Sequence, residues 1–204
     1  MKVSLKLLGI VGMLGLILFS SEKKVHSTIL GSEKSPGHEL ELIHTFIQKK
    51  ANKGFYNFHK VAETILVESK KHQIDPLLVV AIIYTESSFR PSIISRVGAV
   101  GLMQVLPSTA KSMLRHAHIN YKKYLLDPVK NIEIGLQYLN HLIKRFNGDS
   151  HLFLTAYNAG PTRVSILKKN RSKLLKQYGY AKKVLKEYTS LQTLRVLNQI
   201  PSEI

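Results

Sequence analysis

The chain has 204 residues, 44% of them hydrophobic, and contains no cysteine. This length suits one compact domain with a buried core, and the lack of cysteine excludes disulfides, thiol catalysis and thiolate metal sites. Lys and Arg number 30 against 13 Asp and Glu, a formal charge of +17, which favours a polyanionic partner such as nucleic acid, anionic lipid or an acidic cell-wall polymer.

The N-terminus has the pattern of an export leader. Lys2 and Lys6 precede a run without charge over residues 7–19, and small serines follow it. A positive start before a short apolar core is typical of a signal peptide, whereas a spanning helix needs about 20 apolar residues. We predict that residues 1–21 are a signal peptide or, alternatively, an uncleaved anchor in which residues 3–20 hold the protein in the inner membrane. In both cases we expect export to the cell envelope, in the periplasm or at the cell surface.

Residues 22–57 are predicted to be a linker and an N-terminal helical segment. Residues 22–37 are polar and contain Gly and Pro, as linkers often do. Two runs with apolar residues at helical spacing follow, separated by the breaker NKGFYN at 52–57. The two runs consist of Leu40, Ile43, Phe46 and Ile47, and of Phe58, Val61, Ala62, Ile65 and Leu66.

Start and stop signals then mark a series of helices. Asp75-Pro76 and Asp127-Pro128 each place a capping residue before a Pro at the first helical position. Gly148 ends the second of these helices, Gly160 ends a short helix with the sequence HLFLTAYN, and Pro161 begins another. The last predicted helix reads YAKKVLKEYTSLQTLRVL. Because no strand-like alternation of any length occurs, we predict an all-α globular fold.

Glu86 lies at the end of an apolar helix and is the only acid in residues 76–126. The residues on the same helix face, three or four positions apart, are Val79, Ile82 and Ile83. Burial and the negative end of the helix dipole both disfavour a charged carboxylate. We therefore expect a raised pKa for Glu86, which is what general acid catalysis needs near neutral pH. The alternatives are a side chain that leans into solvent, or one that pairs with Arg90 or Arg96.

The segments that follow this helix suit a sugar-binding cleft. Gly98 and Gly101 allow tight turns and close approach of the backbone, and Gln104 is a lone polar residue in an apolar stretch. Tyr157 and Asn158 stand just before a Gly-Pro break. An aromatic ring can stack on a sugar, and an amide can bind hydroxyl or acetamido groups.

Three motifs, in this order, are similar to those of a known family. They are ESSF at 86–89, GAVGLMQV at 98–105 and AYNAG at 156–160, with a weaker match, NIEIGLQYL, at 131–139. The chain resembles the catalytic domain of bacterial peptidoglycan enzymes of the soluble-lytic-transglycosylase (SLT) type, whose fold is similar to goose-type lysozyme. The resemblance covers residues 58–190 and implies a lysozyme-like globular helical domain.

The resemblance also implies a reaction. In this family the motif glutamate protonates the glycosidic oxygen between N-acetylmuramic acid and N-acetylglucosamine. It then acts as base while the muramoyl 6-hydroxyl closes on C1, which leaves a 1,6-anhydromuramoyl end. By motif position the catalytic residue is Glu86. The implied substrate-binding residues are Ser95, Gln104, Tyr157 and, as a weaker carry-over, Asn158. No cofactor and no metal is implied, and no HExxH occurs among the nine His.

Other functions stay open at this stage. A lysozyme-like muramidase of the same fold would use water and two carboxylates, about 5–9.5 Å apart. The acids that folding could bring close are Glu63, Glu68, Asp127, Glu133 and Asp149. A wall-binding accessory of a secretion or conjugation apparatus would keep the groove without catalysis. A nucleic-acid binder is favoured by charge alone, and the export leader argues against it. The chain departs from the family at Leu106, where the family often has Met. We expect this difference to alter the packing of the subsite and to leave the activity in place.

Domain and partner assignments complete these predictions. We assign residues 58–190 to the lytic transglycosylase domain and residues 191–204 to a C-terminal tail. The expected partner is the glycan strand of peptidoglycan, and an anionic envelope surface or a secretion apparatus is a further candidate. We expect no nucleic-acid partner and a monomeric protein. Residues 163–195 contain ten basic residues against one acid, Glu187. They are the strongest candidate for an anion-facing surface, although ordinary exposed helix faces explain them equally well.

Overall fold

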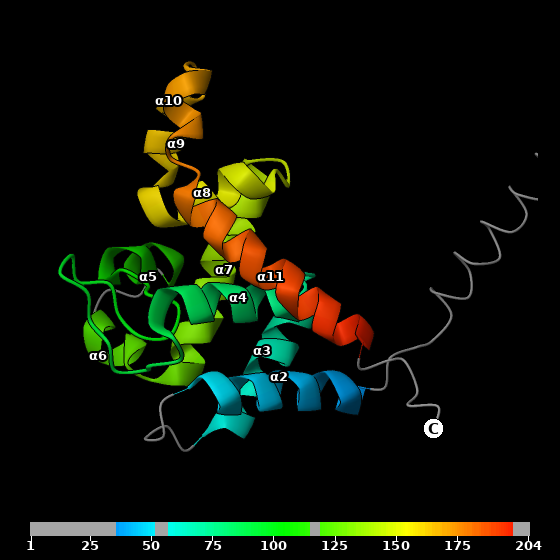
Figure 1. Ribbon diagram of the computed structural model, residues 1–204. Helices are drawn as coiled ribbons and strands as arrows, with labels where there is room; N and C mark the ends of the chain where they lie inside the picture. Colours follow the sequence, from blue (N-terminus) through cyan, green and yellow to red (C-terminus); the bar gives the residue numbers. More distant parts are fainter. Residues whose placement is uncertain (1–35, 52–56, 115–118, 198–204) are drawn as a thin grey trace, which may run out of the picture. The chain divides into compact units, whose positions relative to one another are not determined.

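The computed structural model describes residues 36–51, 57–114 and 119–197 (Figure 1). The predicted leader, nearly all of the predicted linker, and His116 and His118 lie outside these residues. The chain divides into one unit that ends at His38 and a compact unit from Glu39 onward, which holds the described residues except the start of the first helix, 36–38. The domain boundaries predicted from the sequence stay predictions.

The described residues form helices, and the predicted all-α class is confirmed. Among these residues, none of the helices is both long enough and apolar enough to span a bilayer. The helices are α2 (Pro36–Lys50), α3 (Phe58–His72), α4 (Pro76–Ser87), α5 (Pro107–Leu114), α6 (Tyr121–Leu125), α7 (Pro128–Arg145), α8 (Ser150–Ala159), α9 (Pro161–Leu167), α10 (Arg171–Leu175) and α11 (Gly179–Leu197).

Side-chain caps fix where the main helices begin. The Asp75 carboxylate accepts a hydrogen bond from the Leu77 N–H at 2.9 Å, at the start of α4. Asp127 caps α7 in the same way at 3.0 Å, with Pro128 in the first turn, as the sequence predicts. Asp149 caps α8 through the Leu152 N–H at 3.0 Å. Each cap satisfies a backbone donor that the helix itself leaves without a partner.

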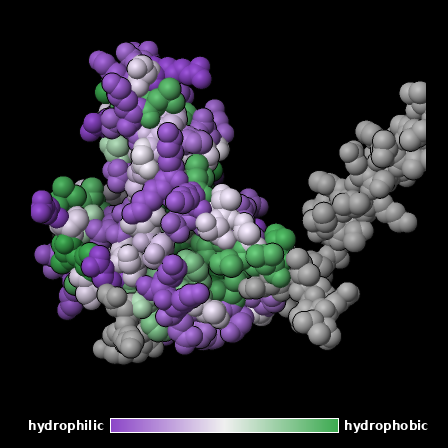
Figure 2. Space-filling model, viewed as in Figure 1, coloured by the Kyte–Doolittle hydropathy of each residue, from purple (hydrophilic) through white to green (hydrophobic). Residues whose placement is uncertain are grey.

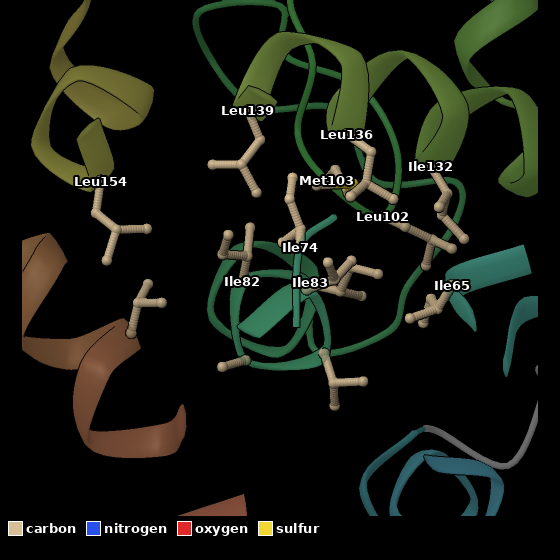
Figure 3. Close-up of a cluster of buried hydrophobic side chains, with 14 of the residues drawn as sticks. Ile65, Ile74, Ile82, Ile83, Leu102, Met103, Ile132, Leu136, Leu139 and Leu154 are labelled. Carbon is tan, nitrogen blue, oxygen red and sulfur yellow. The ribbon is translucent and has the colours of Figure 1, made fainter. Parts of the chain in front are cut away.

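Helix α4 is the centre of the core because it is apolar on every side. Its residues 79–83 are all fully buried. Helix α3 and helix α11 both pack on α4, and α11 also packs on α8 (Figure 1). Figure 3 shows Ile82 and Ile83 of α4 among side chains of α7 and of the segment that follows α4, such as Leu136 and Met103. Helix α4 is thus held on several sides, which gives its last turn a fixed position.

The segment between α4 and α5, residues 88–106, is a compact loop with two isolated bridges, which pair Val100 with Ile94 and with Val105. Gly98 and Gly101 have φ angles of +82° and +79°, so the predicted tight turns are present. A side chain at Gly101 would collide with Asn131 and with the Leu125 carbonyl. Only glycine therefore fits at this position, for reasons of both conformation and space.

Candidate active site

Glu86 lies in the last turn of α4 and accepts a hydrogen bond from the Tyr180 hydroxyl, with 2.7 Å between the two oxygens. Burial raises the pKa of the Glu86 carboxyl, while the Tyr180 hydrogen bond and the positive charge of Lys183 oppose that rise. The raised pKa agrees with the sequence prediction. Arg90, one of the two predicted alternative partners, instead donates to the Ser87 carbonyl at 2.9 Å.

Two half-buried tyrosines flank this carboxyl. Burial, followed by the negative charge of Glu86, raises the pKa of both Tyr157 and Tyr180 well above the ordinary value of a phenol. Both hydroxyls therefore remain protonated and act as hydrogen-bond donors. Tyr157 donates to the Met103 carbonyl at 2.9 Å, and its ring lies 5.5 Å from that of Tyr138, centroid to centroid. Tyr157 thus joins α8 to the loop that carries the GAVGLMQV motif.

A cleft of about 370 Å³ opens beside Glu86. The structure brings all five site residues named from the sequence to its wall: Glu86, Ser95, Gln104, Tyr157 and Asn158. The other lining residues are Val97, Ala99, Val105, Leu106, Thr109, Tyr138, Ala159 and Gly160. The lining mixes rings, aliphatic groups and a few polar groups, which is the usual make-up of a small-ligand site.

Among the residues that line the cleft, Glu86 is the only carboxylate. The five acids considered as a second catalytic carboxylate have other roles. Asp127 and Asp149 are helix caps. The three glutamates form ion pairs with basic neighbours on their own helices: Glu63 with His59 and Lys60, Glu68 with Lys71 and His72, and Glu133 with Lys130. The described cleft therefore offers one acid, where a glycosidase that activates water uses two.

Ser95 and Gln104 also hold the loop together. The Ser95 hydroxyl accepts a hydrogen bond from the Ala99 N–H at 3.0 Å. The side-chain nitrogen of Gln104 donates to the carbonyls of Ile93 and Gly101, at 3.2 and 2.9 Å. Since its nitrogen serves the loop, the side-chain oxygen of Gln104 is the group available to a ligand.

Sequence reasoning missed two residues that shape the site. Asn131, in α7, is fully buried and accepts from the Met103 N–H at 2.7 Å. Its side-chain nitrogen donates to the carbonyls of Val100 and Leu125 at 2.8 and 2.9 Å. A polar side chain inside an apolar helical run was the available signal. Tyr180, by contrast, lies 94 residues beyond its partner, and no local pattern points to it.

Potential metal ligands do not gather in the described part of the chain, where no group of three or more His, Asp or Glu is placed to bind an ion. The predicted lack of a metal stays a prediction, because His116 and His118 lie outside that part.

The family model described as "Transglycosylase SLT domain" matches residues 63–179. The match covers more than half of the chain, so the chain belongs to this family. A protein named membrane-bound lytic murein transglycosylase C, from Histophilus somni (strain 2336), is 42% identical over 101 residues, which are 44% of this chain and 28% of that protein. The transglycosylase of Enterobacteria phage PRD1 is 38% identical over 111 residues, 54% of this chain and 38% of the phage protein.

A solved structure has the same fold. The lytic transglycosylase Slt of Pseudomonas aeruginosa, crystallised as an inactive mutant with Gln in place of a Glu, superposes with a TM-score of 0.58 and 31% identity. The superposition covers 65% of this chain and 24% of the Pseudomonas protein. The predicted lysozyme-like helical fold is therefore confirmed. The chain spans well under half of the length of each of these three relatives.

Proposed function

We propose that this protein is a peptidoglycan lytic transglycosylase that cleaves the bond between N-acetylmuramic acid and N-acetylglucosamine. The observation that carries the proposal is a single half-buried carboxyl, Glu86, with a raised pKa on the wall of a cleft built from the three family motifs. The names of the relatives, two lytic transglycosylases and a phage transglycosylase, support the same activity.

Glu86 acts as acid and then as base. Its protonated carboxyl gives a proton to the glycosidic oxygen as the bond to C1 of the muramoyl sugar breaks. The 6-hydroxyl of the same sugar attacks C1, and the carboxylate of Glu86 takes the proton of that hydroxyl. The products are a free N-acetylglucosamine 4-hydroxyl and a 1,6-anhydromuramoyl end, and no water is consumed. A single acid suffices because the nucleophile belongs to the substrate, whereas water attack needs a second carboxylate.

Tyr180 acts as a positioning residue for Glu86. Its hydroxyl donates to one carboxyl oxygen, Oε1, so the transferable proton is carried on the other oxygen, Oε2. The hydrogen bond stabilises the carboxylate that forms after proton transfer. Ser95, Gln104, Tyr157 and Asn158 are proposed to bind the sugars, because all four line the same cleft.

The test is digestion of purified peptidoglycan with mass spectrometry of the fragments. We expect wild-type protein to release anhydro ends, lighter than reducing ends by one water, and the Glu86→Gln variant to lose at least about 10²-fold in rate. Glu133→Gln is the matched control, because Glu133 pairs with Lys130 outside the cleft and should keep full activity. Reducing ends would identify a lysozyme-like muramidase. A Glu86→Gln variant that is as functional as wild type would identify a wall-binding accessory protein.

We also propose that the protein works in the cell envelope. The support is the leader-like pattern of residues 1–21 and the name of the Histophilus relative, which is membrane-bound. A reporter fused to the C-terminus, active only outside the cytoplasm, tests export. N-terminal sequencing of the envelope fraction distinguishes a cleaved leader from an anchor.

A further inference from the structure

Helices α9 and α10 with the residues around them, 161–176, form a strongly basic segment that the proposed reaction does not use; we name it the basic arm. It contains no acid. Its basic side chains are all exposed: Arg163, Lys168, Lys169, Arg171, Lys173 and Lys176. The arm is anchored through the buried side chains of Val164 and Leu174. Helix α9 packs on α8, and α10 packs on α9, so the arm lies beyond α8 (Figure 1).

The charges of the basic arm are not neutralised within the described chain. Several basic residues elsewhere pair with an acid, as Lys71 does with Glu68 and Lys130 with Glu133. Among the described residues, none of the six basic side chains of the arm forms an ion pair. Like charges so close together repel one another, so the arm favours an anionic surface that supplies the missing countercharge.

The basic arm also exposes large aliphatic side chains among its cations. Ile166 is 65% exposed and Leu175 is 50% exposed, and Figure 2 shows hydrophobic patches among the hydrophilic residues at the α9–α10 end. A soluble polyanion has no apolar region in which such aliphatic side chains could be buried. An anionic bilayer accepts both groups, because the basic residues meet the lipid headgroups while the aliphatic residues enter the boundary of the acyl region.

We propose that the basic arm binds the surface of an anionic phospholipid membrane. The arm begins at Pro161, directly after Gly160, which lines the cleft. Binding through the arm therefore holds the cleft close to the bilayer, beside the glycan strands that lie nearest to the membrane. This inference does not depend on the proposed catalytic activity.

The absence of cysteine allows a direct test on the full chain. A single Ser172→Cys substitution, in the arm, is labelled with a polarity-sensitive dye, and Ser190→Cys, on the exposed surface of α11, is the control position. We expect vesicles that contain phosphatidylglycerol to shift the emission of the dye at residue 172 to the blue and to leave residue 190 unchanged. Phosphatidylcholine vesicles should shift neither. Both proteins carry the same N-terminal segment, so binding through that segment cannot produce the difference.

Matched variants then separate charge from apolar contact. Each cation near an anionic surface contributes about fivefold in affinity. Replacing four lysines of the arm by Ser should therefore lower the affinity for the vesicles, measured by titration of the emission shift, by more than about 10²-fold. The four are Lys168, Lys169, Lys173 and Lys176, and the control set of exposed lysines is Lys49, Lys70, Lys122 and Lys123. Replacing Ile166 and Leu175 by Ser should lower the affinity for the vesicles by about tenfold or more. The control pair is Val67 and Leu197, which are similarly exposed. Replacing this pair by Ser should change the affinity for the vesicles little.

Three results would overturn the proposal. The first is an equal shift at residues 172 and 190. The second is an equal loss of vesicle affinity when either lysine set is replaced, which would mean that net charge alone drives binding. The third is a shift at residue 172 with soluble polyphosphate as large as that with vesicles, which would identify a binder of polyanions. The comparison of the two label positions needs no lysine variant, so it decides the question even if a multiple variant fails to fold.

Discussion

Replacing Asn131 by Ala should destabilise both the fold and the cleft. The change removes three hydrogen bonds and leaves the Met103 N–H and the Leu125 carbonyl without the partner that Asn131 gives them, while the Val100 carbonyl keeps the Val105 N–H at 3.0 Å. Each unsatisfied buried group costs about 1–3 kcal/mol, and two groups lose their partner, so the free energy of unfolding should fall by about 2–6 kcal/mol. That is a large part of the roughly 5–15 kcal/mol of a typical domain. At about 2–4 °C per kcal/mol for this size, the melting temperature should fall by at least about 4 °C.

Urea unfolding followed by circular dichroism measures this loss. The matched control is Asn140→Ala on the same helix, because the partly buried side chain of Asn140 shares a hydrogen bond with His72 at 3.2 Å. We expect this control to lower the free energy of unfolding by about 1 kcal/mol. Asn131→Asp keeps an acceptor for the Met103 N–H but turns an oxygen toward two carbonyls, so it should be as damaging as Asn131→Ala. A loss below about 1 kcal/mol for Asn131→Ala, or one equal to the control, would refute the idea that this amide holds the loop.

Three further outcomes follow from the ionisable groups. Tyr180→Phe removes a hydrogen bond that lowers the pKa of Glu86, so the alkaline limb of the pH–rate profile should move to higher pH; an unchanged or lower limb contradicts the assigned contact. Burial raises the pKa of Glu86 above its unfolded value of about 4.3, so ionisation destabilises the fold above that pH. Thermal melts should therefore show Glu86→Gln as stable as wild type near pH 4 and more stable at pH 8, and a less stable variant at pH 8 would reverse that sign. Arg195 joins α11 to the α4 cap, Asp75, at 3.1 Å with little exposure; Arg195→Ala should cost about 1–3 kcal/mol in urea unfolding, and no loss would show that this contact is dispensable.

Local sequence signals predicted most of the secondary structure. The Asp-Pro pairs before α4 and α7 mark both helix starts correctly, because capping depends on a few adjacent residues. The apolar run of α4 predicted a buried helix with Glu86 at its end, and the structure confirms both the position and the raised pKa. The three motifs predicted which segments meet at the cleft, although periodicity alone says nothing about which segments come together.

Contacts between distant segments were decided only by the tertiary structure. The sequence suggested three environments for the Glu86 side chain: solvent, a pair with an arginine, or burial. The packing of α11 across α4 added Tyr180, a hydrogen-bond partner that none of these interpretations included. The same packing places Tyr188 and Arg195 on Asp75, at the opposite end of α4. Helical periodicity states which face of a helix is apolar, but it does not say which helix covers that face.

The sequence by itself therefore determined that the described part of the chain is helical, that one carboxyl ends the most apolar helix of that part, and which motifs surround that carboxyl. Only the tertiary structure decided that the other candidate acids are used in caps and ion pairs, and that Asn131 fastens the loop of the cleft. The reason is physical. A cap or an apolar stripe depends on neighbours within one or two turns, whereas the partner of a buried polar group depends on how whole helices pack against one another.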